Sequence, residues 1–315
     1  MKRVLVTRRL PDGGLDPLAR EGVELLTRDG DELYTHDELV EAARDVDAIV
    51  CLLTDRIDAE ILRAGAPRLR VVANVAVGYD NVDVAAAAEL GVTVCNTPGV
   101  LDETTADTAF LLILAASRLA SEAEADLRAG RWPGWGINQY LGRDVHGATL
   151  GIVGYGRIGQ AVARRAAGFG MQVLHHARND VGDPGYVADL DTLLTESDVV
   201  SLHVPLTGET RHLIGARELA LMRRGAVLVN TARGPVVDEE ALAIALERGV
   251  IFAAGVDVYE REPTVHPRLL AAPRTVLLPH IGSASLATRT RMARVAANAV
   301  RLVFAGERPP NAVTL

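Results

Sequence analysis

Hydrophobic residues in this chain come in short clusters that alternate with amphipathic stretches along most of its length. This alternation predicts β-strands separated by helices, and hence parallel sheets built from βαβ units. In the first third of the chain, strands are expected at residues 3–7, 23–26, 48–52, 70–74 and 92–95. Helices are expected between them, at residues 37–44, 59–64 and 84–90.

A second series of apolar clusters predicts a second parallel sheet, with strands near residues 149–153, 171–175, 198–203, 226–230, 251–256 and 275–278. Two sheets in 315 residues suit two domains of about 150 residues each. Long helices are expected at 103–129 and 285–304. The first of these has an apolar middle, so we expect it to be buried on several sides, between domains or against a second subunit.

Composition narrows the possible partners. The chain is 49% apolar, and its net charge of −8 and pI near 5.5 argue against nucleic-acid and membrane-surface partners. Cys51 and Cys95 lie in apolar stretches, which predicts buried thiols in a reducing cytosol rather than a disulfide or a metal site. No signal-peptide pattern is present, and the longest apolar run, 109–116, is too short to span a bilayer. We therefore expect a cytoplasmic protein.

The expected strand at 149–153 is followed at once by the spacing G-x-G-x-x-G and then by a helix-prone segment. In such a unit Gly154 permits a sharp turn, Gly156 lets a pyrophosphate approach the backbone, and Gly159 lets the helix pack closely on the strand. The start of the helix offers unpaired N–H groups to the phosphates. The motif predicts a dinucleotide site.

Polar residues follow three later strands of the same series. Arg233 comes after the strand at 226–230, Asp257 and then Glu262 come after the next strand, and His280 comes after the last. The carboxyl ends of strands are where open α/β sheets bind ligands. Each residue alone would more often be a solvated loop residue, but together and beside a dinucleotide turn they predict an active site.

Seven blocks resemble motifs of the D-isomer-specific 2-hydroxyacid dehydrogenases, most closely those of the glyoxylate/hydroxypyruvate reductase branch. They lie, in order along nearly the whole chain, at 74–83 (NVAVGYDNVD), 96–107, 150–159, 201–207 (SLHVPLT), 230–234 (NTARG), 255–263 and 279–283. The resemblance implies an α/β fold of two Rossmann-like or flavodoxin-like parallel-sheet domains. The substrate-binding domain would be discontinuous, residues 1–98 plus 287–315, and 99–286 would bind the dinucleotide. The active site would lie in the cleft between them, with hinges near 96–100 and 280–285.

The resemblance also implies roles for three residues. Arg233 would bind the carboxylate of a 2-oxo acid and polarise its carbonyl group. His280 would act as general acid and base, a role to which imidazole is suited near neutral pH. Glu262 would orient the histidine ring and favour its protonated form.

Further contacts follow from the same resemblance. Substrate contacts are implied at Leu53, Ala76, Val77 and Gly78, the backbone N–H groups of the last three cradling the carboxylate. Asp257 would face the nicotinamide carboxamide, and His203 would lie near the cofactor rather than at the chemistry. The full set of implied cofactor contacts is Thr105, Gly154, Gly156, Arg157, Ile158, Gly159, Ala177, Arg178, Asn179, His203, Val204, Pro205, Thr231, Ala232, Asp257, His280 and Gly282.

The choice between NADPH and NADH depends on the segment after the second strand of this domain. Ala177 stands where an NAD-specific site usually carries an acid, and Arg178 follows it. An arginine that pairs with the 2′-phosphate would favour NADPH by roughly tenfold to 150-fold. Asp180 lies just past the expected position. We expect NADPH, with NADH as the alternative.

Related families differ at single positions. The 3-phosphoglycerate dehydrogenases usually carry an arginine near the position of Asn74, phosphite dehydrogenases carry a lysine at Val77, and formate dehydrogenases carry a glutamine at Glu262. These differences favour a small 2-oxo acid, such as glyoxylate or hydroxypyruvate, and leave open which side chain it carries. The alternatives are another D-2-hydroxyacid dehydrogenase, such as a 3-phosphoglycerate dehydrogenase, or a nucleotide-sensing binding protein like the C-terminal-binding-protein corepressors.

The family is usually dimeric through the long helix after the first hinge. Both tryptophans of the chain, Trp132 and Trp135, lie in the segment 130–136 just after that helix. Tryptophan is enriched at the centres of protein interfaces. We expect a homodimer in which this loop reaches toward the cleft of the partner.

Overall fold

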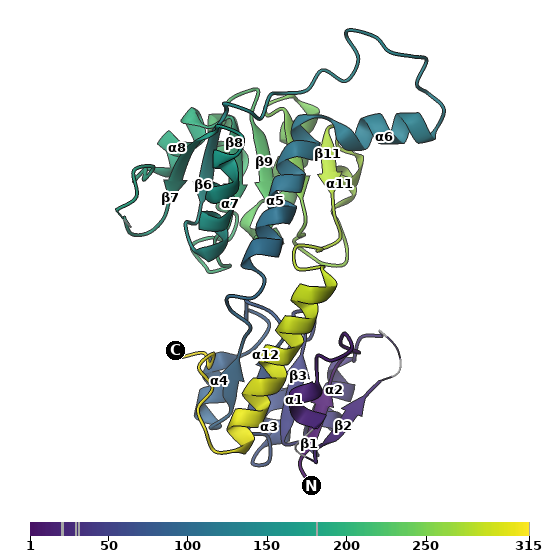
Figure 1. Cartoon of the computed structure of the whole chain (residues 1–315), viewed down its shortest axis with the longest axis vertical. Coiled ribbons are helices and arrows are strands. Elements are labelled where there is room, and N and C mark those ends of the chain that lie inside the picture. The colour runs from purple at the N-terminus through teal and green to yellow at the C-terminus, as the bar shows by residue number, and fades with distance from the viewer. Residues whose placement is uncertain (20–21, 29, 31, 181, 315) are drawn as a thin grey trace. The chain divides into compact units, whose positions relative to one another are not determined.

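The structure, a computed structural model, describes residues 1–19, 22–28, 30, 32–180 and 182–314. The chain divides into two compact units. The first unit is Met1–Leu101 with Ser283–Leu315, and the second is Asp102–Gly282. Each unit contains one parallel sheet (Figure 1), which confirms the fold class expected from the sequence.

The first unit has a five-stranded sheet of order β2-β1-β3-β4-β5. Its strands are β1 (Arg3–Val6), β2 (Glu24–Thr27), β3 (Ala48–Cys51), β4 (Val71–Asn74) and β5 (Thr93–Cys95). Its helices are α1 (Asp16–Ala19), α2 (His36–Ala43), α3 (Ala59–Gly65), α4 (Val84–Glu89) and α12 (Leu286–Phe304). The helices α2, α3 and α4 share one hydrophobic core with the sheet, whereas α1 packs on α12 and α12 packs on β4.

The second unit has a six-stranded sheet of order β11-β10-β9-β8-β6-β7. Its strands are β6 (Thr149–Val153), β7 (Gln172–His176), β8 (Val199–Leu202), β9 (Val227–Asn230), β10 (Ala253–Val256) and β11 (Thr275–Leu277). Its helices are α5 (Asp102–Ser117), α6 (Ala120–Arg128), α7 (Arg157–Ala167), α8 (Leu190–Glu196), α9 (Ala216–Leu221), α10 (Glu239–Glu247) and α11 (Pro267–Ala271). A 3-10 turn, η1 (Gly234–Val236), follows β9.

Helices cover both faces of this second sheet. α5 and α7 form a core with one face, and α8, α9 and α10 form a core with the other. Strands covered on both faces read as continuous apolar runs, and every residue of β8, β9 and β10 is buried. β7 and β8 pair with opposite edges of β6, so the chain order reverses there. Such a reversal leaves a crevice at the carboxyl ends of the strands, where α/β sheets bind ligands.

The prediction of a single helix at 103–129 is wrong. The structure has two helices, α5 and α6, separated at Leu119, whose φ of 53° is left-handed. The carbonyl oxygen of Ser117 accepts a hydrogen bond from the N–H of Arg143 at 2.8 Å, so the chain turns away from the helix axis there. α5 is largely buried, whereas α6 has no buried residue. The sequence pattern therefore did not distinguish a buried helix from the solvent-exposed helix that follows it.

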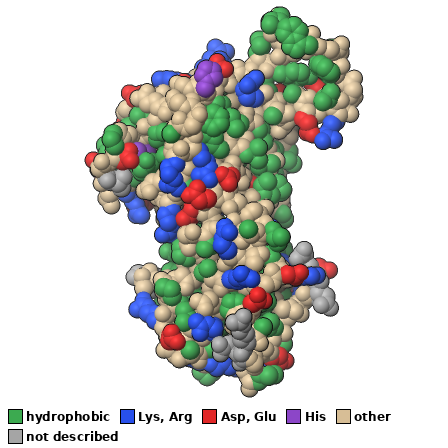
Figure 2. All heavy atoms as spheres, in the orientation of Figure 1, with side chains coloured by type: hydrophobic (Ala, Val, Ile, Leu, Met, Phe, Trp, Pro, Cys, Tyr) green, Lys and Arg blue, Asp and Glu red, His purple; other side chains and the backbone are tan. Residues whose placement is uncertain are grey.

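Large apolar side chains are exposed on α5, on α6 and in the segment after α6. Figure 2 shows hydrophobic side chains gathered over α6 and that segment. The exposed fraction reaches 81% at Trp135. The residues of this exposed apolar surface are Leu111, Leu127, Trp132, Trp135, Ile137 and Leu141.

Both cysteines are buried, as the sequence predicts. Burial raises the pKa of the Cys95 thiol to about 12 and raises that of Cys51 above its usual range. Over the described ranges, no group of three or more His, Cys, Asp and Glu side chains is arranged to hold a metal ion. In the same part of the chain, no helix has the length and apolar character needed to cross a membrane.

Candidate active site

Three glycines shape the turn between β6 and α7. Gly154 has a φ of +97°, and a methyl group added there would lie 2.6 Å from the carbonyl carbon of His203. A methyl group added at Gly159 would lie 2.2 Å from the carbonyl oxygen of Gly154. At Gly156, however, φ is −79° and the methyl group would meet no atom within 4 Å. Folding therefore requires glycine at the first and last positions, whereas the space over Gly156 is open to a ligand.

The amino end of α7 faces this turn, and the first backbone N–H groups of a helix have no partner within the helix itself. Gly156 is the N-cap of α7 and has no side chain to accept a hydrogen bond from the first-turn amides. These N–H groups and the helix dipole favour a phosphate at this end. Arg157, the first residue of the helix, has a side chain that is 65% exposed and lies 3.5 Å from the carboxylate of Asp102. Its guanidinium group adds positive charge at the same helix end.

Two residues at neighbouring strand ends also fit a bound dinucleotide. Thr231 follows β9, and its buried hydroxyl group has no hydrogen-bond partner among the described residues. Orphaned buried hydroxyl groups are uncommon, and a ligand would satisfy this one. His203 follows β8, and its Nε2 lies 2.8 Å from Oγ of Ser201. Burial lowers the pKa of His203 to about 3, so its ring is neutral at neutral pH.

The residues expected to contact the cofactor ribose lie directly after β7. Ala177 follows the last residue of this strand and provides no carboxylate. Arg178 is exposed and forms no hydrogen bond or ion pair within the described ranges. Asp180 is turned into its own loop, where Oδ1 accepts the N–H of Gly182 at 2.7 Å.

His280 and Glu262 form a hydrogen-bonded pair in the second unit. Nδ1 of His280 lies 2.8 Å from Oε2 of Glu262, and their side chains are 25% and 26% exposed. Burial raises the pKa of Glu262. The hydrogen bond and charge of His280, the N–H of Tyr259 and the charge of Arg233 together lower it more, so that it lies below its ordinary value. Glu262 is therefore ionised at neutral pH. A carboxylate in this position orients an imidazole ring and stabilises positive charge on it.

Asp257 holds the turn that carries His280. It is 1% exposed, and its carbonyl oxygen accepts the N–H of His280 at 2.9 Å. Its carboxylate accepts the N–H groups of Ile281 and Gly282, each at 2.8 Å. Burial raises the pKa of Asp257, opposed by these hydrogen bonds and by the charge of His280. The φ of 54° at His280 is unusual for a residue with a side chain, and these three contacts account for its persistence.

Arg233 lies in the turn after β9. The side chain of Asn230 fixes the backbone of this turn. Its Oδ1 accepts the N–H of Ala232, and its Nδ2 donates to the carbonyl oxygen of Arg233, both at 3.0 Å. Nη1 of Arg233 donates to the carbonyl oxygen of Ala232 at 2.9 Å. The charge of Arg233 also contributes to the lowered pKa of Glu262, so the guanidinium group is close enough to act on the pair with His280.

One residue that the sequence did not single out joins the segments carrying these groups. Tyr259 donates its backbone N–H to Oε1 of Glu262 at 3.0 Å, and its hydroxyl group donates to the carbonyl oxygen of Leu278 at 2.9 Å. A methyl group added at Gly234 would lie 1.8 Å from the carbonyl carbon of Tyr259, so the turn after Arg233 packs directly on the backbone of the tyrosine. Its only sequence signal was its place inside the block 255–263.

The substrate contacts implied for the first unit also lie at one edge of a sheet. Leu53 follows β3, and Ala76, Val77 and Gly78 follow β4. β3 and β4 pair in parallel, so all four residues lie at the carboxyl edge of the first sheet. The remaining predicted residues, apart from Thr105 on α5, lie around strand ends of the second sheet. There, a methyl group added at Gly282 would lie 3.5 Å from Cγ2 of Thr105, which places that threonine beside the turn after His280.

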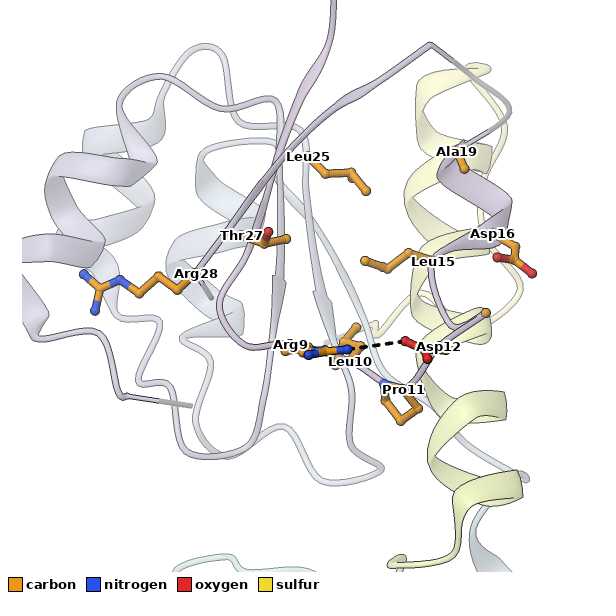
Figure 3. Close-up of a pocket in the computed structure, with 11 residues that line it drawn as sticks. Arg9, Leu10, Pro11, Asp12, Leu15, Asp16, Ala19, Leu25, Thr27 and Arg28 are labelled. Carbon is orange, nitrogen blue, oxygen red and sulfur yellow. Dashed lines mark ion pairs between the residues drawn. The ribbon is translucent and has the colours of Figure 1, made fainter. Parts of the chain in front are cut away.

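The first unit also contains a hollow of about 380 Å³ beside α1 and β2 (Figure 3). It includes none of the predicted site residues. Arg9 and Asp12 form an ion pair of 3.8 Å at its edge, and Arg28 is bound elsewhere, 2.6 Å from Glu38. We assign this hollow no part in the chemistry.

Known proteins share this architecture over nearly the whole chain. The family model for the D-isomer specific 2-hydroxyacid dehydrogenase NAD binding domain matches residues 110–282. A glyoxylate reductase of Korarchaeum cryptofilum is 50% identical, over 99% of this chain and 95% of its own length. The structure of a glyoxylate reductase from Paecilomyes thermophila superposes with a TM-score of 0.88 and 37% identity, covering 99% of this chain and 98% of that one.

A further similar structure is the NADPH-dependent glyoxylate/hydroxypyruvate reductase of Sinorhizobium meliloti in complex with NADP and malonate. Its TM-score is 0.86 at 36% identity, with 99% of this chain and 97% of that one covered. The family model spans more than half of the chain, and the match to the cited relative covers 95% of that protein. The chain therefore belongs to the D-isomer specific 2-hydroxyacid dehydrogenase family and is an oxidoreductase of 2-hydroxy acids that uses a nicotinamide cofactor.

Proposed function

We propose that this enzyme reduces glyoxylate or hydroxypyruvate to the corresponding 2-hydroxy acid, in the D configuration where the product is chiral. The observation that carries the proposal is the His280–Glu262 pair, with the charge of Arg233 acting on it. The glyoxylate reductases that are similar over nearly their whole length support the choice of substrate. The second unit would bind the cofactor and supply the catalytic groups.

Each member of this trio has a separate task in the proposed reaction. A bound reduced nicotinamide would supply the hydride that reaches the carbonyl carbon. Arg233 would bind the substrate carboxylate and stabilise the negative charge that develops on the carbonyl oxygen. His280 would donate a proton to that oxygen, and Glu262 would hold the ring in place and balance its positive charge. In the reverse direction the histidine would accept the proton.

The loop after β4 supports a small substrate with a single carboxylate. Its residues 74–78 contain no lysine or arginine that could bind a second anionic group. Asn74 is fully buried, and its amide donates to the carbonyl oxygen of Gly78 at 2.9 Å. This loop therefore offers no basic side chain to pair with a phosphate beside the carboxylate, which disfavours 3-phosphohydroxypyruvate as the substrate.

The cofactor in this proposal is NADPH. Three observations support this choice. Arg178 is exposed and has no hydrogen bond or ion pair with any described residue, and position 177 is an alanine rather than an acid. The carboxylate of Asp180 already accepts the N–H of Gly182. The similar reductase of Sinorhizobium meliloti is described as NADPH-dependent. A guanidinium group is suited to the two negative charges of a 2′-phosphate.

We also propose that the enzyme is a homodimer joined through the exposed apolar surface of α5, α6 and the segment after α6. Leu111 is 51% exposed in the middle of a helix that is otherwise largely buried. Contiguous exposed apolar side chains, tryptophans above all, commonly mark protein interfaces.

The proposed reaction predicts turnover of glyoxylate or hydroxypyruvate with NADPH, measured by the absorbance of the reduced nicotinamide. His280→Asn should lower kcat by about 10²–10⁴-fold, because it removes the proton donor. Arg224→Gln removes an exposed guanidinium group elsewhere in the second unit and is the control for Arg233→Gln, which should lose nearly all activity. A wild-type protein that binds NADPH but reduces no 2-oxo acid would contradict the proposal and favour a nucleotide-sensing role.

Glu262→Gln should change the pH dependence of reduction. In the proposed reaction Glu262 stabilises positive charge on His280 only while its carboxylate is ionised. The lowered pKa of Glu262 keeps it ionised at neutral pH, so the wild type should lose kcat through this group only when the pH falls through that lowered pKa. The glutamine variant has no carboxylate to protonate, so its lower kcat should lack this loss at acid pH. Glu240→Gln makes the same change of charge at an exposed position of α10, and its pH profile of kcat should match the wild type. Identical profiles for both variants would exclude this role of Glu262.

Arg178→Ala should raise the KM for NADPH by about tenfold to 150-fold and leave the KM for NADH nearly unchanged, because only NADPH carries the 2′-phosphate. Steady-state kinetics with each cofactor would measure both values. Arg224→Ala, which removes the same charge at a distant exposed position, should alter neither. If the ratio of the two KM values in Arg178→Ala equals that of the wild type, Arg178 does not select the cofactor.

Light scattering at micromolar concentration should give twice the chain mass of 33.5 kDa. Trp135→Asp should lower this mass toward that of a monomer, because it places a charge in the proposed interface. Leu270→Asp places the same charge on α11, where the replaced leucine is 60% exposed, and should leave the mass unchanged. A wild-type protein with the mass of one chain would exclude the dimer.

A further inference from the structure

The loop after β4 has three consecutive carbonyl oxygens that are each held by a donor from elsewhere in the first unit. The carbonyl oxygen of Ala76 accepts the N–H of Thr97 at 2.8 Å. That of Val77 accepts Nδ2 of Asn96 at 2.7 Å, and that of Gly78 accepts Nδ2 of Asn74 at 2.9 Å. Two of the three donors are asparagine side chains, one before the loop and one after it.

Holding a carbonyl oxygen also sets the direction of an N–H group. The C=O of one residue and the N–H of the next share a planar trans peptide group and point in opposite directions. Anchoring the carbonyl oxygens of residues 76–78 therefore turns each N–H group of Val77, Gly78 and Tyr79 away from the donor that holds the preceding carbonyl oxygen. Within the ranges that the structure describes, none of these three N–H groups donates a hydrogen bond to another residue.

The two asparagines are themselves fixed. Asn74 is fully buried, and its Nδ2 also lies 3.0 Å from Oδ1 of Asn81. Asn81 in turn donates to the carbonyl oxygens of Leu52 and Asp55, at 3.1 and 2.9 Å. These bonds connect the loop after β4 to the loop after β3.

The backbone of Asn96 is bound on both sides by Asn311. The N–H of Asn96 donates to the carbonyl oxygen of Asn311 at 3.3 Å, and Nδ2 of Asn311 donates to the carbonyl oxygen of Asn96 at 2.6 Å. Neither Asn74 nor Asn96 can therefore follow the loop if it moves. Groups held in this way present a preformed receptor, which binds a ligand at a lower entropic cost than a mobile loop.

We propose that Asn74 and Asn96 are positioning residues, which aim the N–H groups of Val77, Gly78 and Tyr79 at the carboxylate of the 2-oxo acid. The inference rests on the proposed function. Successive backbone N–H groups form a recurrent anion-binding arrangement, and here the three residues that carry them have no charged side chain. A receptor made of backbone N–H groups alone suits a substrate with one carboxylate, because no second anionic group then needs a basic side chain. The asparagines themselves touch the loop backbone and not the substrate.

The test measures substrate and analogue binding in Asn96→Ala and Asn74→Ala. Each variant should raise the KM for glyoxylate by about threefold to tenfold and lower kcat by a smaller factor, because the bonds that aim the receptor act mainly in binding. The Kd of oxamate, a 2-oxo acid analogue whose amide carbonyl is not reduced, should rise by the same factor in calorimetry with the NADPH complex. The Kd of NADPH itself should not change.

Asn298→Ala is the matched control. Asn298 is an exposed asparagine of α12 whose side chain bonds only to Arg301 within the described residues, so its loss should leave all four constants unchanged. Asn96 is half-buried, so Asn96→Ala decides the question if Asn74→Ala fails to fold.

Unchanged KM for glyoxylate and unchanged Kd for oxamate in a folded Asn96→Ala protein would overturn the proposal, and so would equal losses in kcat and kcat/KM with oxamate binding intact. A wild-type protein that reduces no 2-oxo acid would contradict the proposed function instead. Oxamate binding would then still test the receptor: wild-type binding that weakens in Asn96→Ala would support it, and a wild type that does not bind oxamate would overturn it.

Discussion

In the second unit, the sheet edge that carries the proposed catalytic residues depends on one buried carboxylate. Asp257 bonds the N–H groups of Ile281 and Gly282 with its side chain, and that of His280 with its carbonyl oxygen. A buried carboxylate without partners would be strongly destabilised, so this turn cannot relax without leaving the charge unsatisfied. The constraint keeps His280 in a left-handed conformation and brings its ring to Glu262.

At other strand ends, too, a polar side chain hydrogen-bonds the backbone that follows the strand. Asn230 bonds the backbone after β9, and Asn74 bonds the backbone after β4. Where a strand ends, the following backbone loses its ladder partners, and its buried polar groups must be satisfied in another way. A buried amide or carboxylate side chain satisfies them and at the same time fixes the loop. Loops fixed on a rigid sheet are suited to hold reacting groups, because their geometry does not have to be rebuilt on binding.

How far the sequence predicts the structure differs between kinds of feature. The strands lie within two residues of their expected positions, because parallel strands covered on both faces are continuous apolar runs. The break between α5 and α6 was missed, because it depends on the contact between Ser117 and Arg143 and not on local periodicity. Tyr259 was missed for a similar reason: its backbone and hydroxyl group act on segments that precede and follow it at a distance.

By itself, the sequence determined the alternation of strands and helices and the glycine spacing of the turn. It also determined the order in which the arginine, the acids and the histidine of the candidate site follow successive strands. These features are local, since they depend on neighbours within one turn or one strand. Only the tertiary structure decided that Glu262 bonds His280, that Asp257 holds the turn beyond it, and that Asn74 and Asn96 fix one loop from two sides. The distance and direction of these bonds depend on how separate strands are stacked in a sheet, and a one-dimensional pattern does not contain that geometry.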